Sequence, residues 1–298
     1  MAAVNRSGVV LKPRQSRLRR LIVSGRWVDL VIGLLLAIFS VAMFYPFAWL
    51  IFSSFKTGED IVRVPVTLLP QKWTLAAYRM VLDPNRANLP QAYLNSILVS
   101  TGTVLAVLFT SSLGGFAFAR LNFPLKRYLF YFILSTTMVP FLTLLIPLYI
   151  VVKYLHLLNS LWGLIVPSFF SSFGIFLTRQ FVYGIPSEMY DAAKIDGSTD
   201  FMIYRSIILP LTKPVLSALA IFNFLGSFNA FLWPLVVLND ENKMTLPLIL
   251  RRMADRFGGT DYEGVMAGSV LVSVPPLIVF LIFQRNFVRG IALTGMKG

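Results

Sequence analysis

The chain has 298 residues, of which 56% are apolar and only 13% are charged. Soluble domains carry about 25% charged residues, so this composition indicates a membrane protein that crosses the bilayer several times. The sequence has no cysteine and one histidine, which excludes disulfides, zinc fingers, thiol chemistry and any site built from several histidines. A net charge of +14 would suit nucleic acid, but the distribution of the charge argues against that partner.

The N-terminal segment carries a dense group of positive charges. Seven of the 27 Lys and Arg residues precede Trp27, and no acid interrupts them. A basic leader before a long apolar stretch determines topology and attracts anionic lipid headgroups. We therefore predict residues 1–27 to be a basic cytoplasmic arm. It is not expected to be a cleaved signal peptide, because the apolar stretch that follows is too long and lacks a small-residue cleavage site.

Six apolar stretches are long enough to cross a bilayer, which takes about 20 residues each. They are residues 28–53, 94–119, 128–152, 161–182, 215–238 and 264–284. The predicted fold is therefore all-α, a polytopic membrane protein with six transmembrane helices within residues 28–284. Six spans place both termini on one side of the membrane.

The loops define the orientation. The segments on the side of the N-terminus hold more Lys and Arg than those on the other side, so both termini are predicted to be cytoplasmic. The segment 183–214 and the tail 285–298 then lie in the cytoplasm. The segments 54–93 and 239–263 are extracytoplasmic.

The spans lack the groups that several kinds of chemistry need. Apart from Asp29 at the start of the first span, their central parts contain no ionisable side chain. Ion-coupled transporters keep such groups near the midplane, and hydrolases need an acid, a base or metal ligands. No Gly-Lys-Ser/Thr phosphate loop occurs, so any ATP is bound by another subunit. We expect no catalytic residue, no metal site and no cofactor in this chain.

The stretch 186–214 is a polar segment between two apolar stretches, and its sequence predicts two short helices. Ser187 is the predicted N-cap of the first, and acids in its first turn suit the helix dipole. Gly197 is a left-handed stop signal, and Ser198 or Thr199 can cap the second helix. That helix is expected to run to about Leu209, where Pro210 bends or ends it.

The first of these helices has a small apolar face. Met189, Ala192 and Ala193 lie at positions i, i+3 and i+4, so they share one side. From the pattern alone, a partner contact and an ordinary surface loop are equally acceptable interpretations.

The spacing in this loop resembles a known signature. Asp191-Ala192-Ala193, then Gly197, then Leu209-Pro210 is similar to the loop of the integral-membrane permease subunits of ABC importers, which begins Glu-Ala-Ala. The resemblance implies a type I permease fold. It also implies that residues 187–210 form a coupling helix and its support in a cleft of a cytoplasmic ATPase, which binds the Mg-ATP. The coupling residues would be Glu188, Asp191, Ala192, Ala193, Asp196, Gly197, Leu209 and Pro210.

The fifth span combines aromatic rings with amides, notably Asn223, Phe228, Asn229 and Trp233. Rings that stack on sugar faces and amides that bond hydroxyls are the chemistry of a sugar path. Aromatic residues are also common in helix packing and at membrane interfaces, so both interpretations stay open from the pattern.

Two further stretches, 228–235 and 284–298, resemble the carbohydrate branch of the same family, the second permease of maltose-type and glycerol-3-phosphate-type importers. This implies a sugar importer in the inner membrane with a homologous second permease, two ATPase copies, a solute-binding protein that engages 239–263, and no nucleic acid. Gly295, Lys297 and Gly298 would reach the ATPase interface, and direct sugar contacts would fall largely on the other permease. The rival functions are an ATP-independent secondary transporter and a membrane scaffold.

Overall fold

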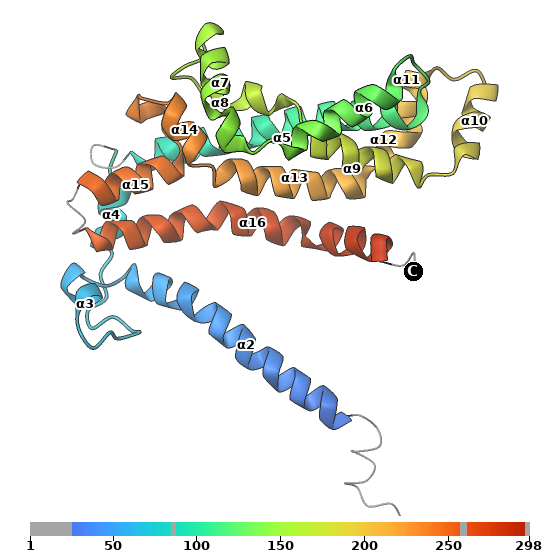
Figure 1. Ribbon diagram of the computed structural model, residues 1–298. Helices are drawn as coiled ribbons and strands as arrows, with labels where there is room; N and C mark the ends of the chain where they lie inside the picture. Colours follow the sequence, from blue (N-terminus) through green and yellow to red (C-terminus); the bar gives the residue numbers. More distant parts are fainter. Residues whose placement is uncertain (1–25, 85–87, 257–260, 296–298) are drawn as a thin grey trace, which may run out of the picture. The chain divides into compact units, whose positions relative to one another are not determined.

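The computed structural model describes residues 26–84, 88–256 and 261–295, and every element in these ranges is helical (Figure 1). The chain divides into two compact units between Phe52 and Ser53. The first unit is formed by helix α2 (Arg26–Ser53), whose apolar part Trp27–Ser53 is long enough to cross a membrane.

The second unit contains all the remaining helices. In chain order they are α3 (Gly58–Val62), α4 (Ala76–Leu82), α5 (Leu89–Arg120), α6 (Lys126–Ser135), η1 (Thr136–Met138), α7 (Phe141–Tyr154), α8 (Trp162–Ile165), η2 (Val166–Phe169), α9 (Ser172–Tyr183), α10 (Ser187–Ile195), α11 (Asp200–Ile203), η3 (Tyr204–Ile208), α12 (Leu209–Leu211), α13 (Lys213–Phe228), α14 (Leu232–Val237), η4 (Glu241–Lys243), α15 (Leu246–Arg256) and α16 (Tyr262–Gly295).

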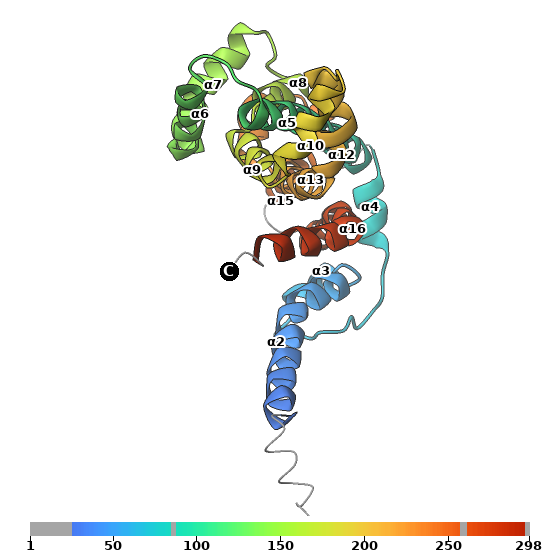
Figure 2. The ribbon, with the colours of Figure 1, turned by 90° about the vertical axis from the view of Figure 1, so that its right-hand side faces the viewer.

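Helix α5 is the centre of the second unit. Helices α9 and α13 pack along it, and α16 lies along α13 (Figures 1 and 2). Polar side chains on α5 hold a distant loop in place. The Asn95 amide donates hydrogen bonds of 2.8 and 3.0 Å to the carbonyls of Asn242 and Met244, and the Ser96 hydroxyl accepts one of 2.7 Å from the Leu246 N–H. These bonds satisfy polar groups that would otherwise be costly to bury.

Two apolar clusters form the core of this unit. One joins α4, the first half of α5, α14, α15 and α16. The other lies at the C-terminal end of α5 and contains Phe116, Ala119, Val182, Ile185, Ile203, Tyr204 and Ile208. The second cluster supports the polar loop that the sequence singles out.

The six predicted spans correspond to three single helices and three bent pairs. The single helices are Trp27–Ser53, Leu89–Arg120 and Tyr262–Ile282. The pairs are Lys126–Met138 with Phe141–Tyr154, bent by 106°; Trp162–Phe169 with Ser172–Tyr183, bent by 42°; and Asp200–Leu211 with Lys213–Phe228, bent by 72°. The all-α membrane fold is therefore confirmed, but three spans are not straight. In the first pair the break falls at Val139, which is extended because it precedes Pro140.

The fifth predicted span, 215–238, is wrong as one continuous helix. Helix α13 ends at Phe228, and a separate short helix, α14, begins at Leu232. Two backbone hydrogen bonds end the last turn of α13. The Asn229 N–H donates to the Leu225 carbonyl, and the Ala230 N–H donates to the Ser227 carbonyl. At the other end of the chain, α16 continues as a helix to Gly295, through most of the predicted tail 285–298.

Candidate functional site

Helix α10 begins one residue earlier than the sequence predicts. Pro186 has φ −54° and ψ 135°, so it occupies the cap position and Ser187 is already the first helical residue. The prediction of Ser187 as N-cap is wrong, and no side chain caps this end. Proline is tolerated at the start of a helix that has no side-chain cap. It lacks an N–H, and an N–H at that position would have no partner within the helix.

The C-terminal end of α10 follows the prediction. Gly197 has φ +82°, the left-handed conformation that glycine adopts most readily. The Ser198 N–H donates to the Ala193 carbonyl at 2.9 Å, and the Gly197 N–H donates to the Lys194 carbonyl at 3.0 Å. These two bonds form a Schellman motif. The Thr199 hydroxyl then caps α11 by accepting from the Met202 N–H at 3.3 Å.

The predicted apolar face of α10 is divided between two sides of the helix. Ala193 is half-buried and packs, with Tyr190, against the Phe116 cluster of the core. Met189 and Ala192 point away from the core, and with Ile195, which is 86% exposed, they form an apolar surface that we call the docking face. The acids Glu188, Asp191 and Asp196 are also exposed.

Asp200 fastens α10 to the next helix. The Tyr190 hydroxyl donates a hydrogen bond to Asp200 Oδ1, and the Lys194 ammonium lies 2.8 Å from the same oxygen. Burial, followed by this hydrogen bond, raises the pKa of Tyr190 to about 12. The phenol therefore remains protonated, and able to donate, throughout the physiological pH range. We call these three residues the Asp200 clamp, which the sequence analysis did not identify as part of the site.

Replacing Asp200 by Ala is expected to loosen α10 without unfolding the subunit. The change removes the acceptor of two bonds, and because the carboxylate is partly exposed the loss is about 1 kcal/mol. Amide hydrogen exchange across 187–195 should then be about fivefold faster in the purified subunit, as measured by mass spectrometry. Asp191→Ala, at an exposed acid on the same helix, is the control. Equal exchange in both variants would show that the clamp does not hold α10.

The loop is also anchored to α5. The Arg120 guanidinium, at the end of α5, donates hydrogen bonds to the carbonyls of Val182 and Ile185, which precede α10. About two turns earlier on α5, the Ser112 and Tyr204 hydroxyls lie 2.8 Å apart. The ring of Phe116 contacts both Tyr190 and Tyr204. These contacts connect the loop that carries α10 to α5.

The second helix of the loop does not end at Leu209. It continues through η3, a π-helical turn, into α12, which ends at Leu211, so Pro210 lies inside the helical stretch. In the wider turn the Leu209 N–H bonds to the Tyr204 carbonyl, and such π turns are often found at functional sites. Leu209 packs against the core cluster and Pro210 is exposed. The 72° bend falls immediately afterwards, between Leu211 and Lys213.

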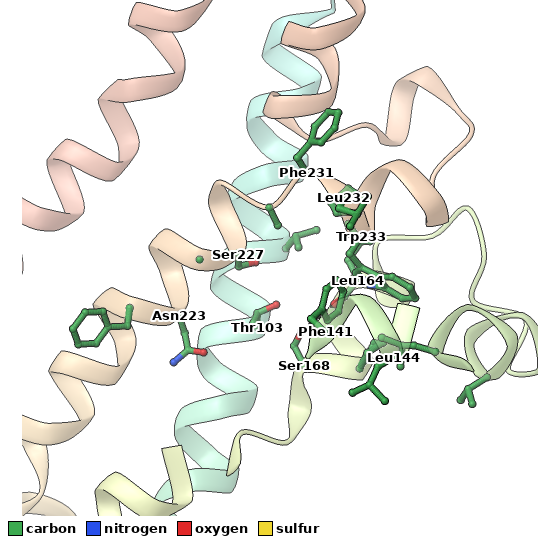
Figure 3. Close-up of a pocket in the computed structure, with 18 of the residues that line it drawn as sticks. Thr103, Phe141, Leu144, Leu164, Ser168, Asn223, Ser227, Phe231, Leu232 and Trp233 are labelled. Carbon is green, nitrogen blue, oxygen red and sulfur yellow. Dashed lines mark hydrogen bonds between the residues drawn. The ribbon is translucent and has the colours of Figure 1, made fainter. Parts of the chain in front are cut away.

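A cavity of about 760 Å³ lies at the opposite end of α13 (Figure 3). Of the residues predicted to form a translocation path, Asn223 and Trp233 line it. Phe228 is not a lining residue, because it is buried in the core and stacks on Phe224 at 5.6 Å. Asn229 is exposed at the break after α13 and does not line the cavity either. Trp233 is fixed by a hydrogen bond of 3.2 Å from its indole N–H to the Gly163 carbonyl.

The predicted ATPase-interface tail can be followed only to Gly295, the last residue of α16. Lys297 and Gly298 lie outside the described residues.

Bent apolar helices around one long central helix, with an exposed short helix at one end, define the chain as a polytopic helical membrane protein. Residues 102–293 match the family model described as "Binding-protein-dependent transport system inner membrane component". This range includes α10, the Asp200 clamp and nearly all of the cavity. The chain belongs to this family, whose members are transport permeases.

Named relatives agree with the family. The chain is 36% identical over 255 residues to an arabinooligosaccharides transport system permease protein of Halalkalibacterium halodurans, covering 85% of this chain and 91% of the relative. It is 31% identical over 271 residues to an sn-glycerol-3-phosphate transport system permease protein of Brucella melitensis, covering 89% and 94%. A crystal structure of a bacterial ABC transporter that imports the acidic polysaccharide alginate superposes with a TM-score of 0.79 at 25% identity. It covers 93% of this chain and 100% of the solved chain.

Proposed function

We propose that this chain is one permease subunit of an ATP-driven sugar importer. It forms half of the translocation path and is moved by a cytoplasmic ATPase through α10. The observation that carries the proposal is the docking face, an exposed apolar surface on a short helix that is firmly attached to the bundle. A helix of nine residues is marginal alone in water, so its attachment to the core and its outward apolar side suit a contact that transmits force.

The path of that force is proposed from the contacts. Pressure on α10 passes through Tyr190 and the Phe116 cluster to α5, and through Asp200 to the helix that leads into α13. Helices α5 and α13 both contribute to the cavity wall. Closure of the ATPases around Mg-ATP would therefore change the shape of the cavity, as the alternation between inward-facing and outward-facing states requires.

The proposed assembly is supported by the family and by the charge distribution. A homologous second permease completes the path, two ATPase copies bind the cytoplasmic side, and a solute-binding protein that engages 239–263 delivers sugar from the outside. Both termini lie in the cytoplasm, next to anionic lipid headgroups. The Mg-ATP is held entirely by the ATPases, because this chain has no phosphate loop.

The proposal is tested with the complex purified from its own membranes through a tag on this chain. Reconstituted into liposomes with ATP on the ATPase side, the complex should take up sugar and should hydrolyse ATP faster when the loaded binding protein is present. Replacing the phosphate-loop lysine of the ATPase should abolish both activities. Uptake that survives this replacement would favour a secondary transporter. A complex with neither uptake nor solute-dependent ATP hydrolysis would favour a scaffold.

A further inference from the structure

The cavity beside α13 has the composition of a sugar subsite. Its wall is mainly apolar and includes the rings of Phe141, Phe231 and Trp233. Phe141 meets Trp233 edge to face, with centroids 6.4 Å apart and planes at 88°. Because the hydrogen bond to Gly163 also fixes Trp233, the two rings are held at right angles. Fixed ring faces of this kind can cover the apolar faces of a sugar ring without a large loss of side-chain entropy.

Thr103 supplies a hydroxyl that the protein itself does not use. Its side chain is only 5% exposed, and in the described structure its Oγ1 has no hydrogen-bond partner. By contrast, Thr110, two turns further along α5, donates to the Phe169 carbonyl at 2.6 Å. Buried hydroxyls are normally bonded. Thr103 lines the cavity, and rotation of its side chain between staggered rotamers offers the hydroxyl to a molecule bound there.

Asn223 is the amide on the facing helix. Its Nδ2 donates to the Leu219 carbonyl one turn back at 2.8 Å, which fixes the plane of the amide. Figure 3 shows the amide oxygen on the side of Thr103 and Ser168. The amide oxygen from α13 and, once its side chain rotates, the hydroxyl of Thr103 from α5 can therefore reach one molecule bound in the same cavity. A ligand with several hydroxyls satisfies both groups, whereas a lipid chain satisfies neither.

The cavity lacks charge. Among its lining residues, all of which belong to the described chain, none is Asp, Glu, Lys, Arg or His. A phosphate or carboxylate moved from water into such surroundings loses its hydration and gains no cation in return. This half of the path therefore disfavours anionic cargo.

We infer that this cavity is a subsite for an uncharged sugar, in which Thr103 and Asn223 bond to sugar hydroxyls and the aromatic rings cover the sugar faces. The inference rests on the proposed function and adds to it a substrate class and direct sugar contacts on this subunit. It separates the chain from relatives whose named cargo is sn-glycerol-3-phosphate or alginate.

The test uses the reconstituted complex with its own binding protein and three probes: arabinotriose, sn-glycerol-3-phosphate and an alginate trisaccharide. Uptake is expected for the uncharged probe alone. Uptake of either anionic probe would overturn the inference and leave the proposed function standing. If no uncharged sugar that the binding protein binds gives uptake or stimulates ATP hydrolysis, the proposed function is overturned and the inference with it.

A pair of variants tests the subsite itself. Thr103→Val removes the hydroxyl but keeps the shape, and is expected to lower uptake roughly 3- to 10-fold, the usual effect of one lost hydrogen bond. Ser100→Ala removes another buried hydroxyl of α5 that lacks a partner in the described structure but does not line the cavity. It should leave uptake unchanged. Wild-type uptake in Thr103→Val, or an equal loss in both variants, would show that the Thr103 hydroxyl does not bond to the sugar and would overturn the subsite.

Discussion

Replacing Ala192 by Glu is expected to release the ATPase and to lower solute-stimulated ATP hydrolysis at least about tenfold. Ala192 is exposed at the centre of the docking face, between Met189 and Ile195. A larger side chain in a close contact costs about 1–3 kcal/mol, and a buried charge without a partner costs more. Since 1.4 kcal/mol is a tenfold change in affinity, the variant subunit should reach the membrane with little ATPase attached.

The measurement is the amount of ATPase that copurifies with a tagged subunit, followed by the rate of ATP hydrolysis with loaded binding protein. Ala76→Glu is the matched control, because Ala76 is also an exposed helical alanine but lies in the predicted extracytoplasmic segment. It should retain the ATPase fully. Normal ATPase content and hydrolysis in Ala192→Glu would exclude α10 as the coupling helix.

The choice of Ala192 rather than Ala193 for this substitution depends on the structure. From the sequence, Ala192 and Ala193 belong to one apolar face, because neighbours at i+3 and i+4 share a side. In the folded chain Ala193 belongs with Tyr190, against the core, and only Ala192 remains outside. A substitution at Ala193 would therefore confuse coupling with stability. Sequence spacing alone does not show which apolar residues of α10 face the core and which belong to the docking face.

Local signals correctly predicted the C-terminal end of α10 and the start of α11, but not the cap at Ser187 or the end near Leu209. Gly197 in the left-handed region and the cap at Thr199 follow from properties of single residues. The Asp200 clamp could not be predicted from single residues, because Tyr190 and Asp200 are ten positions apart and meet across a turn. The continuation past Leu209 was missed for a related reason. A π-helical turn precedes Pro210, and no composition rule anticipates such a turn.

The membrane spans likewise show what local sequence patterns do not predict. Apolar length alone located the region of each predicted span, because a bilayer imposes it. It placed the fifth span at 215–238, however, where the bent pair covers Asp200–Leu211 and Lys213–Phe228. It did not reveal the 106° and 72° bends, since broken helices are tolerated where protein surrounds the break. A further break, after Phe228, brings Ala230, Phe231 and Leu232 into the lining of the cavity. Consequently, of four residues predicted for the path, Asn223 and Trp233 reach the cavity, while Phe228 and Asn229 do not.

The second large effect is expected at the contact between α5 and α9. A Cβ added to Gly115 would lie 2.6 Å from the Thr178 Cβ and 2.9 Å from the backbone nitrogen of Arg179. Small residues allow membrane helices to approach this closely. Because a backbone atom blocks the site, a side chain there can fit only if α9 moves. That movement would also displace Val182, a member of the core cluster beneath α10.

We therefore expect Gly115→Leu to prevent stable assembly, with a loss of at least about 3 kcal/mol, at the upper end of overpacking effects. The readout is the amount of monodisperse complex and its melting temperature in detergent. Gly226→Leu is the control for folding, since a Cβ at Gly226 has nothing within 4 Å and would project into open space. It should accumulate normally even though Gly226 lines the cavity. If the two variants accumulate and melt alike, the close approach of α5 and α9 does not hold the bundle together. In that case the movement of α10 would have to reach α5 through contacts other than the Phe116 cluster.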